Sequence, residues 1–121
     1  MSAMDLATLR RLAGEGNEEA SNRLVELAAE RRDLVELRAL VDSGNELAGD
    51  QLARLAGERG DIDELRRLVG EGTELAADKL AQFAAAREDI DELSRLADDG
   101  NEVAATLLTR LIRGTGEGGE P

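Results

Sequence analysis

The sequence has no histidine, cysteine, tyrosine or tryptophan, and it has a single phenylalanine and a single proline. The lack of cysteine excludes a disulfide framework and a metal site built from thiolates. Without histidine, cysteine and tyrosine, the usual general base, thiol nucleophile and phenolic acid are all missing. We therefore expect a protein that is not an enzyme, with no catalytic residue, no metal ligand and no cofactor.

Positive charge is also scarce. The chain has 27 acidic and 15 basic residues, which gives a net charge of −12. The acidic residues are spread along the whole chain, so the predicted surface is uniformly acidic. Such a surface repels a phosphate backbone, because nucleic-acid binding depends on Lys and Arg contacts to phosphate. We expect no nucleic-acid partner.

Long apolar runs are missing too. No stretch approaches the roughly 18 apolar residues that a membrane span requires. The opening segment MSAMDLATLR has no basic part followed by an apolar part, which a secretory signal would show. These two features predict a cytoplasmic protein that does not contact a membrane.

What the sequence does contain is a repeat of 28 residues. Its four copies share an opening Asp, at Asp5, Asp33, Asp61 and Asp89. They also share a Gly at one offset, at Gly16, Gly44, Gly72 and Gly100. The copies span residues 5–32, 33–60, 61–88 and 89–116. We expect residues 1–4 to be an N-terminal extension, 5–113 to form a single repeat domain and 114–121 to be a Gly-rich disordered tail.

Each copy carries two helical patterns. The first begins at the Asp, which can cap the opening turn, and ends at the Gly, which takes a left-handed conformation without steric penalty. In the third copy Ile62, Leu65 and Leu68 share one face of this helix. The second helix begins one residue after the Gly, at a good N-cap type: Asn17, Asn45, Thr73 or Asn101. The pattern predicts an all-α solenoid of four helix–turn–helix repeats.

The two end copies differ from the middle ones. The first copy has Glu19 where the others have Leu47, Leu75 and Val103. The last copy has Leu107 in place of Arg23, Gln51 and Lys79, and Ile112 in place of Ala28, Ala56 and Ala84. The apolar residues of the last helix are Leu107, Leu108, Leu111 and Ile112. One interpretation is that they close the core over an incomplete neighbour; the other is a surface for self-association, as in a homodimer through the last repeat.

Charged residues form rows along the first helices at the repeat spacing. A glutamate row consists of Glu36, Glu64 and Glu92, and three residues after that position lie Arg11, Arg67 and Arg95. A further arginine row consists of Arg10, Arg38 and Arg66. One interpretation is an ordinary solvated face with ion pairs inside each helix. The other is that stacking aligns the rows into a charged concave groove for an acidic or extended peptide.

The segments LAGEGNEEASNRL (Leu12–Leu24) and LVDSGNELAGDQL (Leu40–Leu52) resemble the tetratricopeptide and SEL-one-like repeats. In those families a Gly, then Asn or Asp, then an Ala about four residues later, join paired helices. The same pattern here is Gly16-Asn17 with Ala20. The resemblance implies a right-handed α-solenoid used for protein–protein contact.

These observations predict a structural or protein–protein interaction scaffold whose partner is a protein or peptide, or a second copy of the chain. A peptide-binding solenoid with an Arg- and Glu-lined groove is one alternative. An engineered, self-assembling or consensus-type array without a cellular role is another, because the 28-residue spacing has no insertion. The divergence at surface positions, and the use of Arg at every basic position except Lys79, favour natural ancestry.

Overall fold

The computed structural model describes residues 5–116, and in that range the chain forms eight helices and no strand. The helices come in pairs, one pair for each copy of the repeat. Their bounds are α1 Leu6–Gly14, α2 Glu18–Glu30, α3 Leu34–Asp42, α4 Glu46–Arg59, α5 Ile62–Gly70, α6 Glu74–Ala86, α7 Ile90–Asp98 and α8 Glu102–Gly116. The predicted all-α fold of helix–turn–helix repeats is confirmed. None of these helices is both long and apolar enough to cross a membrane.

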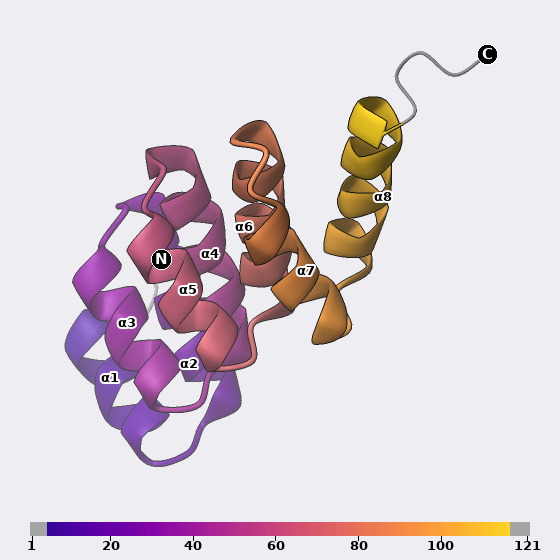
Figure 1. Ribbon diagram of the computed structural model, residues 1–121. Coiled ribbons are helices and arrows are strands. Elements are labelled where there is room, and N and C mark those ends of the chain that lie inside the picture. Colours follow the sequence, from indigo (N-terminus) through magenta and orange to yellow (C-terminus); the bar gives the residue numbers. More distant parts are fainter. Residues whose placement is uncertain (1–4, 117–121) are drawn as a thin grey trace. The chain divides into compact units, whose positions relative to one another are not determined.

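The chain divides into two compact units. The first ends at Leu55 and the second begins at Ala56, so the boundary lies within α4. The first unit holds α1 to α3 and most of α4, and the second holds α5 to α8 (Figure 1). The prediction of a single domain over 5–113 stays a prediction.

The predicted tail begins at residue 114, whereas α8 continues to Gly116. A composition rich in Gly predicts disorder, but a sequence pattern fixes a helix end only to within about two to four residues. The N-terminal extension 1–4 and the rest of the tail, 117–121, lie outside the described residues.

The helix starts follow the capping pattern of the sequence. The carboxylate of Asp33 accepts a hydrogen bond from the backbone N–H of Glu36, and Asp61 and Asp89 accept in the same way, each at 3.1 Å. The side-chain oxygens of the second-helix caps also accept from a backbone N–H: Asn17 from Ala20, Asn45 from Ala48 and Asn101 from Ala104. Thr73 makes no such bond. The predicted caps are therefore present on the Asp and Asn residues.

The ends of α1 to α7 share one hydrogen-bond arrangement. At the end of α7, Gly100 has φ 101° and its N–H donates to the carbonyl of Ala97, while the N–H of Asn101 reaches back to the carbonyl of Leu96. This is the Schellman motif, in which a left-handed residue satisfies the last carbonyls. Its final residue, Asn101, is also the N-cap of α8. A stop and a restart therefore share two adjacent residues, which makes each turn short.

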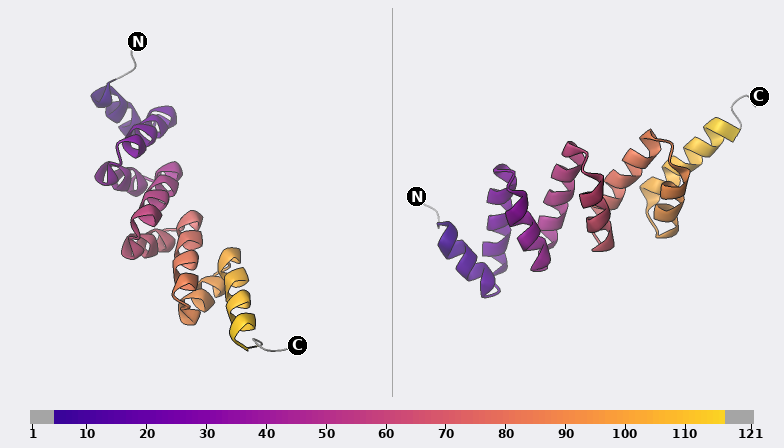
Figure 2. Two further views of the ribbon diagram at one scale, coloured as in Figure 1. Left: turned by 90° about the horizontal axis from the view of Figure 1, so that it is seen from above. Right: turned by 60° about the vertical axis from the view of Figure 1, so that its left-hand side comes forward.

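The core of each unit forms where helices of successive pairs pack. In the first unit α2 packs on both α1 and α3 (Figure 2). In the second unit α6 packs on α5, α7 and α8, and α7 packs on α8. The largest fully buried side chains are Val25, Leu37, Leu55, Leu65, Leu68, Leu80 and Leu93. Each contributes about 1.5–3 kcal/mol relative to an exposed position.

Candidate functional site: the first-helix rows and the two end faces

Ion pairs between successive repeats use part of the charged rows. The guanidinium of Arg10 on α1 donates to the carboxylate of Glu36 on α3, with N and O 3.1 Å apart. In the second unit Arg66 on α5 donates to Glu92 on α7 at 3.5 Å. The glutamates are the more buried partners, at 19% exposure for the side chain of Glu36 and 7% for that of Glu92. These pairs join neighbouring repeats, whereas the interpretation of the rows as a solvated face predicted ion pairs inside each helix.

The arginines one position further along remain more open to solvent. Arg67 pairs with Glu71 at 3.7 Å on the same helix, and its side chain is 58% exposed. Arg95 pairs with Glu92 at 3.2 Å, and its side chain is 64% exposed. Arg11 pairs with Glu15 at 3.4 Å in the same way. Their guanidinium groups therefore keep donors that face solvent.

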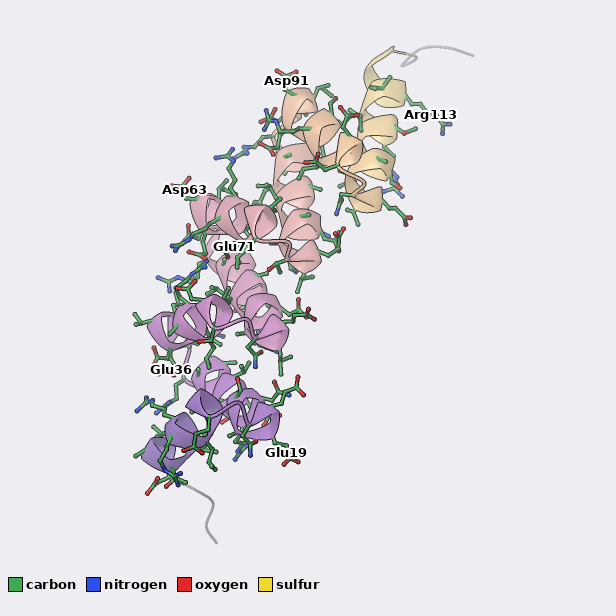
Figure 3. The ribbon with its side chains drawn as sticks, turned by 90° about the horizontal axis from the view of Figure 1, so that it is seen from below. Glu19, Glu36, Asp63, Glu71, Asp91 and Arg113 are labelled. Carbon is green, nitrogen blue, oxygen red and sulfur yellow. The ribbon has the colours of Figure 1, made fainter. Side chains whose placement is uncertain are left out.

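The second unit brings three of the predicted groove residues, Arg66, Glu92 and Arg95, into contact, and Arg67 occupies on α5 the position that Arg95 occupies on α7. Glu92 accepts from both Arg66 and Arg95, and Arg67 lies beside Arg66 in the chain. We call these four residues, Arg66, Arg67, Glu92 and Arg95, the α5–α7 surface. Asp63 and Asp91 project from the same two helices (Figure 3). The surface therefore presents charges of both signs.

Apart from the Arg10–Glu36 pair, two predicted groove residues remain, Arg38 and Glu64, and they are less open to solvent. Arg38 is only 16% exposed in its side chain and pairs with Asp42 at 3.4 Å. Glu64 is half-buried. Neither presents an open charged group comparable to Arg67 or Arg95.

The capping asparagines have a second role that sequence reasoning missed. Asn45 donates from Nδ2 to the Ser21 hydroxyl at 2.7 Å and to the Asn22 carbonyl oxygen at 3.0 Å. In the second unit Asn101 donates from Nδ2 to Glu74 and Asp78, both at 2.8 Å. Each of these asparagines therefore caps its own helix and also bonds the second helix of the preceding repeat. The preference for Asn over Asp at this position is the signal that could have revealed the contact, because only the amide can donate.

The four apolar residues of α8 are not equally exposed. Leu107, Leu108 and Leu111 are half-buried, and Ile112 is 52% exposed. Leu107 is equivalent to Lys79, whose Cδ would lie 3.1 Å from a Cβ placed on Gly57 of α4, the second helix of the preceding repeat. This register places Leu107 on the side of α8 that faces the preceding repeat. Ile112 is equivalent to Ala28, Ala56 and Ala84, which are all buried.

A hollow of about 460 Å³ lies on the first pair of helices. We call it the α1–α2 hollow; it is lined by Leu9, Leu12, Asn17, Glu19, Ala20, Asn22, Arg23 and Glu26. Three of these positions, those of Asn17, Glu19 and Arg23, are the equivalents of Asn45, Leu47 and Lys79. The hollow therefore occupies the side of the first repeat that would face a preceding repeat.

No group of acidic side chains in the described residues is arranged to hold a metal ion. No family model, no curated protein and no solved structure matches the chain.

Proposed function

We propose that the protein is a helical-repeat scaffold that acts through protein–protein contact, with no catalysis, and that the α5–α7 surface binds an extended peptide. The resemblance of its Gly-Asn turns to tetratricopeptide and SEL-one-like repeats supports this class of function. So does the structural use of other polar groups, such as Asp61 in the cap of α5 and the Arg66–Glu92 pair between repeats.

A single observation carries the choice of surface. Arg67 and Arg95 are both more than half exposed and lie on successive first helices, next to the Arg66–Glu92 pair that joins those helices. Their planar guanidinium groups can each donate two parallel bonds to a carboxylate. The peptide that fits this surface has carboxylates at spacings that reach both arginines. Because the whole chain is acidic, we expect moderate affinity that falls as salt screens these contacts.

The test uses a phage-displayed library of short peptides selected on the wild-type protein, followed by anisotropy measurements with the selected peptides. Replacing both Arg67 and Arg95 by Ala should weaken binding about tenfold or more, since each arginine supplies a charge-assisted bond of about 1.5–3 kcal/mol in gross terms. Arg66 is left in place because it holds α5 to α7.

The matched control replaces Arg59 and Arg87, two exposed arginines at the ends of second helices, by Ala. It makes the same change in charge away from the α5–α7 surface. Equal loss of binding in both double variants would reject this surface and indicate a general charge effect. Failure to select any peptide would count against peptide binding itself.

A further inference from the structure

The α1–α2 hollow and the exposed end of α8 are the two places in the described residues where the contacts between repeats stop. We propose that these two faces bind each other between copies of the chain, head to tail, in the register that successive repeats use within each unit. The inference goes beyond the scaffold function above, because it does not involve the α5–α7 surface.

The amide contact supports this register first. Asn101 donates to Glu74 and Asp78 of the preceding repeat. The equivalents of these two acceptors in the last repeat are Glu102 and Thr106, and the equivalent of the donor in the first repeat is Asn17. Asn17 lines the hollow, and both acceptor residues are exposed. A second copy stacked in the same register therefore supplies one carboxylate and one hydroxyl to the Asn17 amide.

Neither of the two faces carries the charged residue that would form the ion pair between successive repeats. Within the units, Arg10 pairs with Glu36 and Arg66 pairs with Glu92. In a head-to-tail junction the arginine position is Ser94 and the glutamate position is Thr8. Two small neutral side chains can meet there, so the junction leaves no charge without its counterpart.

A pair of opposite charges appears at another part of the same junction. The first copy has Glu19 where the later copies have Leu47, Leu75 and Val103. The last copy has Arg113 where the earlier copies have Ala29, Gly57 and Ala85. Glu19 and Arg113 are both exposed, on α2 and α8 (Figure 3).

A Cβ placed on Gly57 would lie 3.1 Å from Cδ of Lys79, which shows that the positions of Gly57 and Lys79 lie close together across successive repeats. Arg113 is equivalent to Gly57, and Arg23 is equivalent to Lys79. Glu19 lies four residues before Arg23 and Glu26 lies three after it, so both carboxylates are neighbours of Arg23 on α2. Glu26 already pairs with Arg23 at 3.0 Å. Arg113 therefore meets two carboxylates and one guanidinium, which is a net attraction.

Such a contact is heterologous, because the two faces differ, and each added copy offers a free face to the next one. We expect oligomers whose weight-average mass rises steadily with concentration. The experiment is light scattering combined with sedimentation velocity. Concentration is measured by refractive index, since the chain has no Tyr or Trp. The chain mass of 12.9 kDa sets the monomer value.

Two charge reversals test the junction. Glu19→Arg and Arg113→Glu should each weaken association about tenfold or more, because each places like charges across the junction. An equimolar mixture of the two variants should associate again, since the reversed face of one is complementary to the reversed face of the other. Arg110→Glu is the matched control, because it makes the same charge change on α8. Arg110 is equivalent to Glu26, which lies on the side of its helix that faces a preceding repeat, so on α8 this position lies away from the proposed junction. This control should associate as the wild type does. Circular dichroism of each variant checks that the helices remain.

A constant mass of 12.9 kDa over the whole concentration range would overturn the inference and leave the peptide proposal standing. So would a dimer in which the same face of both copies meets, because the proposed junction joins two different faces. Association that survives both reversals, or that the mixture does not restore, would place the contact elsewhere and equally reject this junction.

Discussion

At the scale of single residues, the two asparagines that follow Gly44 and Gly100 contribute most to the contacts between repeats. In Asn45 and Asn101 the side-chain oxygen caps one helix and the nitrogen bonds another, so one small side chain joins two repeats. Asn101 is 3% exposed, and it is one of two buried polar or charged residues among those described, together with Glu92. Both of these residues lie at contacts between repeats. Polar groups are therefore buried in the second unit only where they hold neighbouring pairs of helices together.

Substitution of Asn101 separates the cap from the donor bond. Asn101→Asp keeps a good cap but replaces the donor by a carboxylate that faces Glu74 and Asp78. We expect a loss of about 2–3 kcal/mol in the free energy of unfolding, from the lost bonds and the repulsion. Urea unfolding followed by far-UV circular dichroism measures it. The matched control is Asn17→Asp, which should change stability by less than about 0.5 kcal/mol because Asp and Asn cap equally well. Equal effects at both positions would show that the donor bonds contribute nothing.

The cap at the start of α1 has a measurable effect on ionisation. The backbone N–H of Thr8 donates to the Asp5 carboxylate at 2.8 Å and, with the Thr8 hydroxyl as a second donor, lowers the pKa of Asp5 below its ordinary value of 3.8. Because the folded-state pKa is the lower one, the cap stabilises the protein above the unfolded pKa. That contribution is lost as the pH falls through the folded value.

Thr8→Ala tests the two donors separately. It removes the hydroxyl and leaves the backbone N–H, so the pKa of Asp5 should rise but stay below the ordinary value. NMR titration of the Asp5 carboxyl carbon gives both values. A wild-type pKa at or above 3.8 would contradict the cap.

At the scale of elements, second helices end as first helices do, although two of them lack the glycine. Gly60 has φ 70°, and the equivalent residues Arg32 and Glu88 have φ 55° and 57°. The sequence predicted left-handed residues only where Gly recurs. The Schellman bonds are formed nonetheless, with the N–H of Asp89 donating to the carbonyl of Ala84 at 2.8 Å. The burial of the neighbouring helices therefore outweighs the local steric cost of a left-handed side chain.

Glycine at such a position should stabilise the protein. We expect Glu88→Gly to raise the free energy of unfolding by about 1 kcal/mol, because it removes the strain of a Cβ at positive φ. Arg87→Gly, one residue earlier at φ −97°, is the control and should destabilise through the added freedom of the unfolded chain. Thermal unfolding of both variants at equal concentration compares them. A loss of stability in Glu88→Gly would mean that the residue is not left-handed in solution.

At the scale of the whole molecule, the sequence predicted the helices well and the contacts between them poorly. Caps and stops are local signals, so Asp61 and Gly72 mark their helix ends without knowledge of the rest of the chain. The Arg66–Glu92 pair and the Asn101 amide bonds join residues that are 23 to 27 positions apart. Their partners depend on how repeats stack, which a periodic pattern does not specify. The sequence therefore showed the charged rows, but it did not show which arginines pair with the next repeat and which remain exposed to solvent.

The net charge of −12 makes a prediction about salt. Two effects oppose each other: added salt weakens exposed ion pairs, and it screens the mutual repulsion of the excess carboxylates. Ion pairs such as Arg23–Glu26 at 3.0 Å and Arg66–Asp63 at 3.8 Å lie well inside a Debye length of about 8 Å at 0.15 M, so salt weakens them little. Repulsion acts over longer distances and is screened strongly as the Debye length falls from about 30 Å at 0.01 M.

We therefore expect NaCl to stabilise the protein between 0.01 and 0.15 M, by on the order of 1 kcal/mol, or roughly 4 °C in Tm. Thermal unfolding by circular dichroism at constant pH measures the change. Sucrose at matched osmolality is the control, because it is itself excluded from the protein surface and does not screen charge, and it should give a smaller increase over this range. A Tm that falls with NaCl would mean that the ion pairs, chiefly Arg10–Glu36 and Arg66–Glu92, outweigh the repulsion. The acidic excess would then be confined to places where carboxylates do not approach one another in the folded chain.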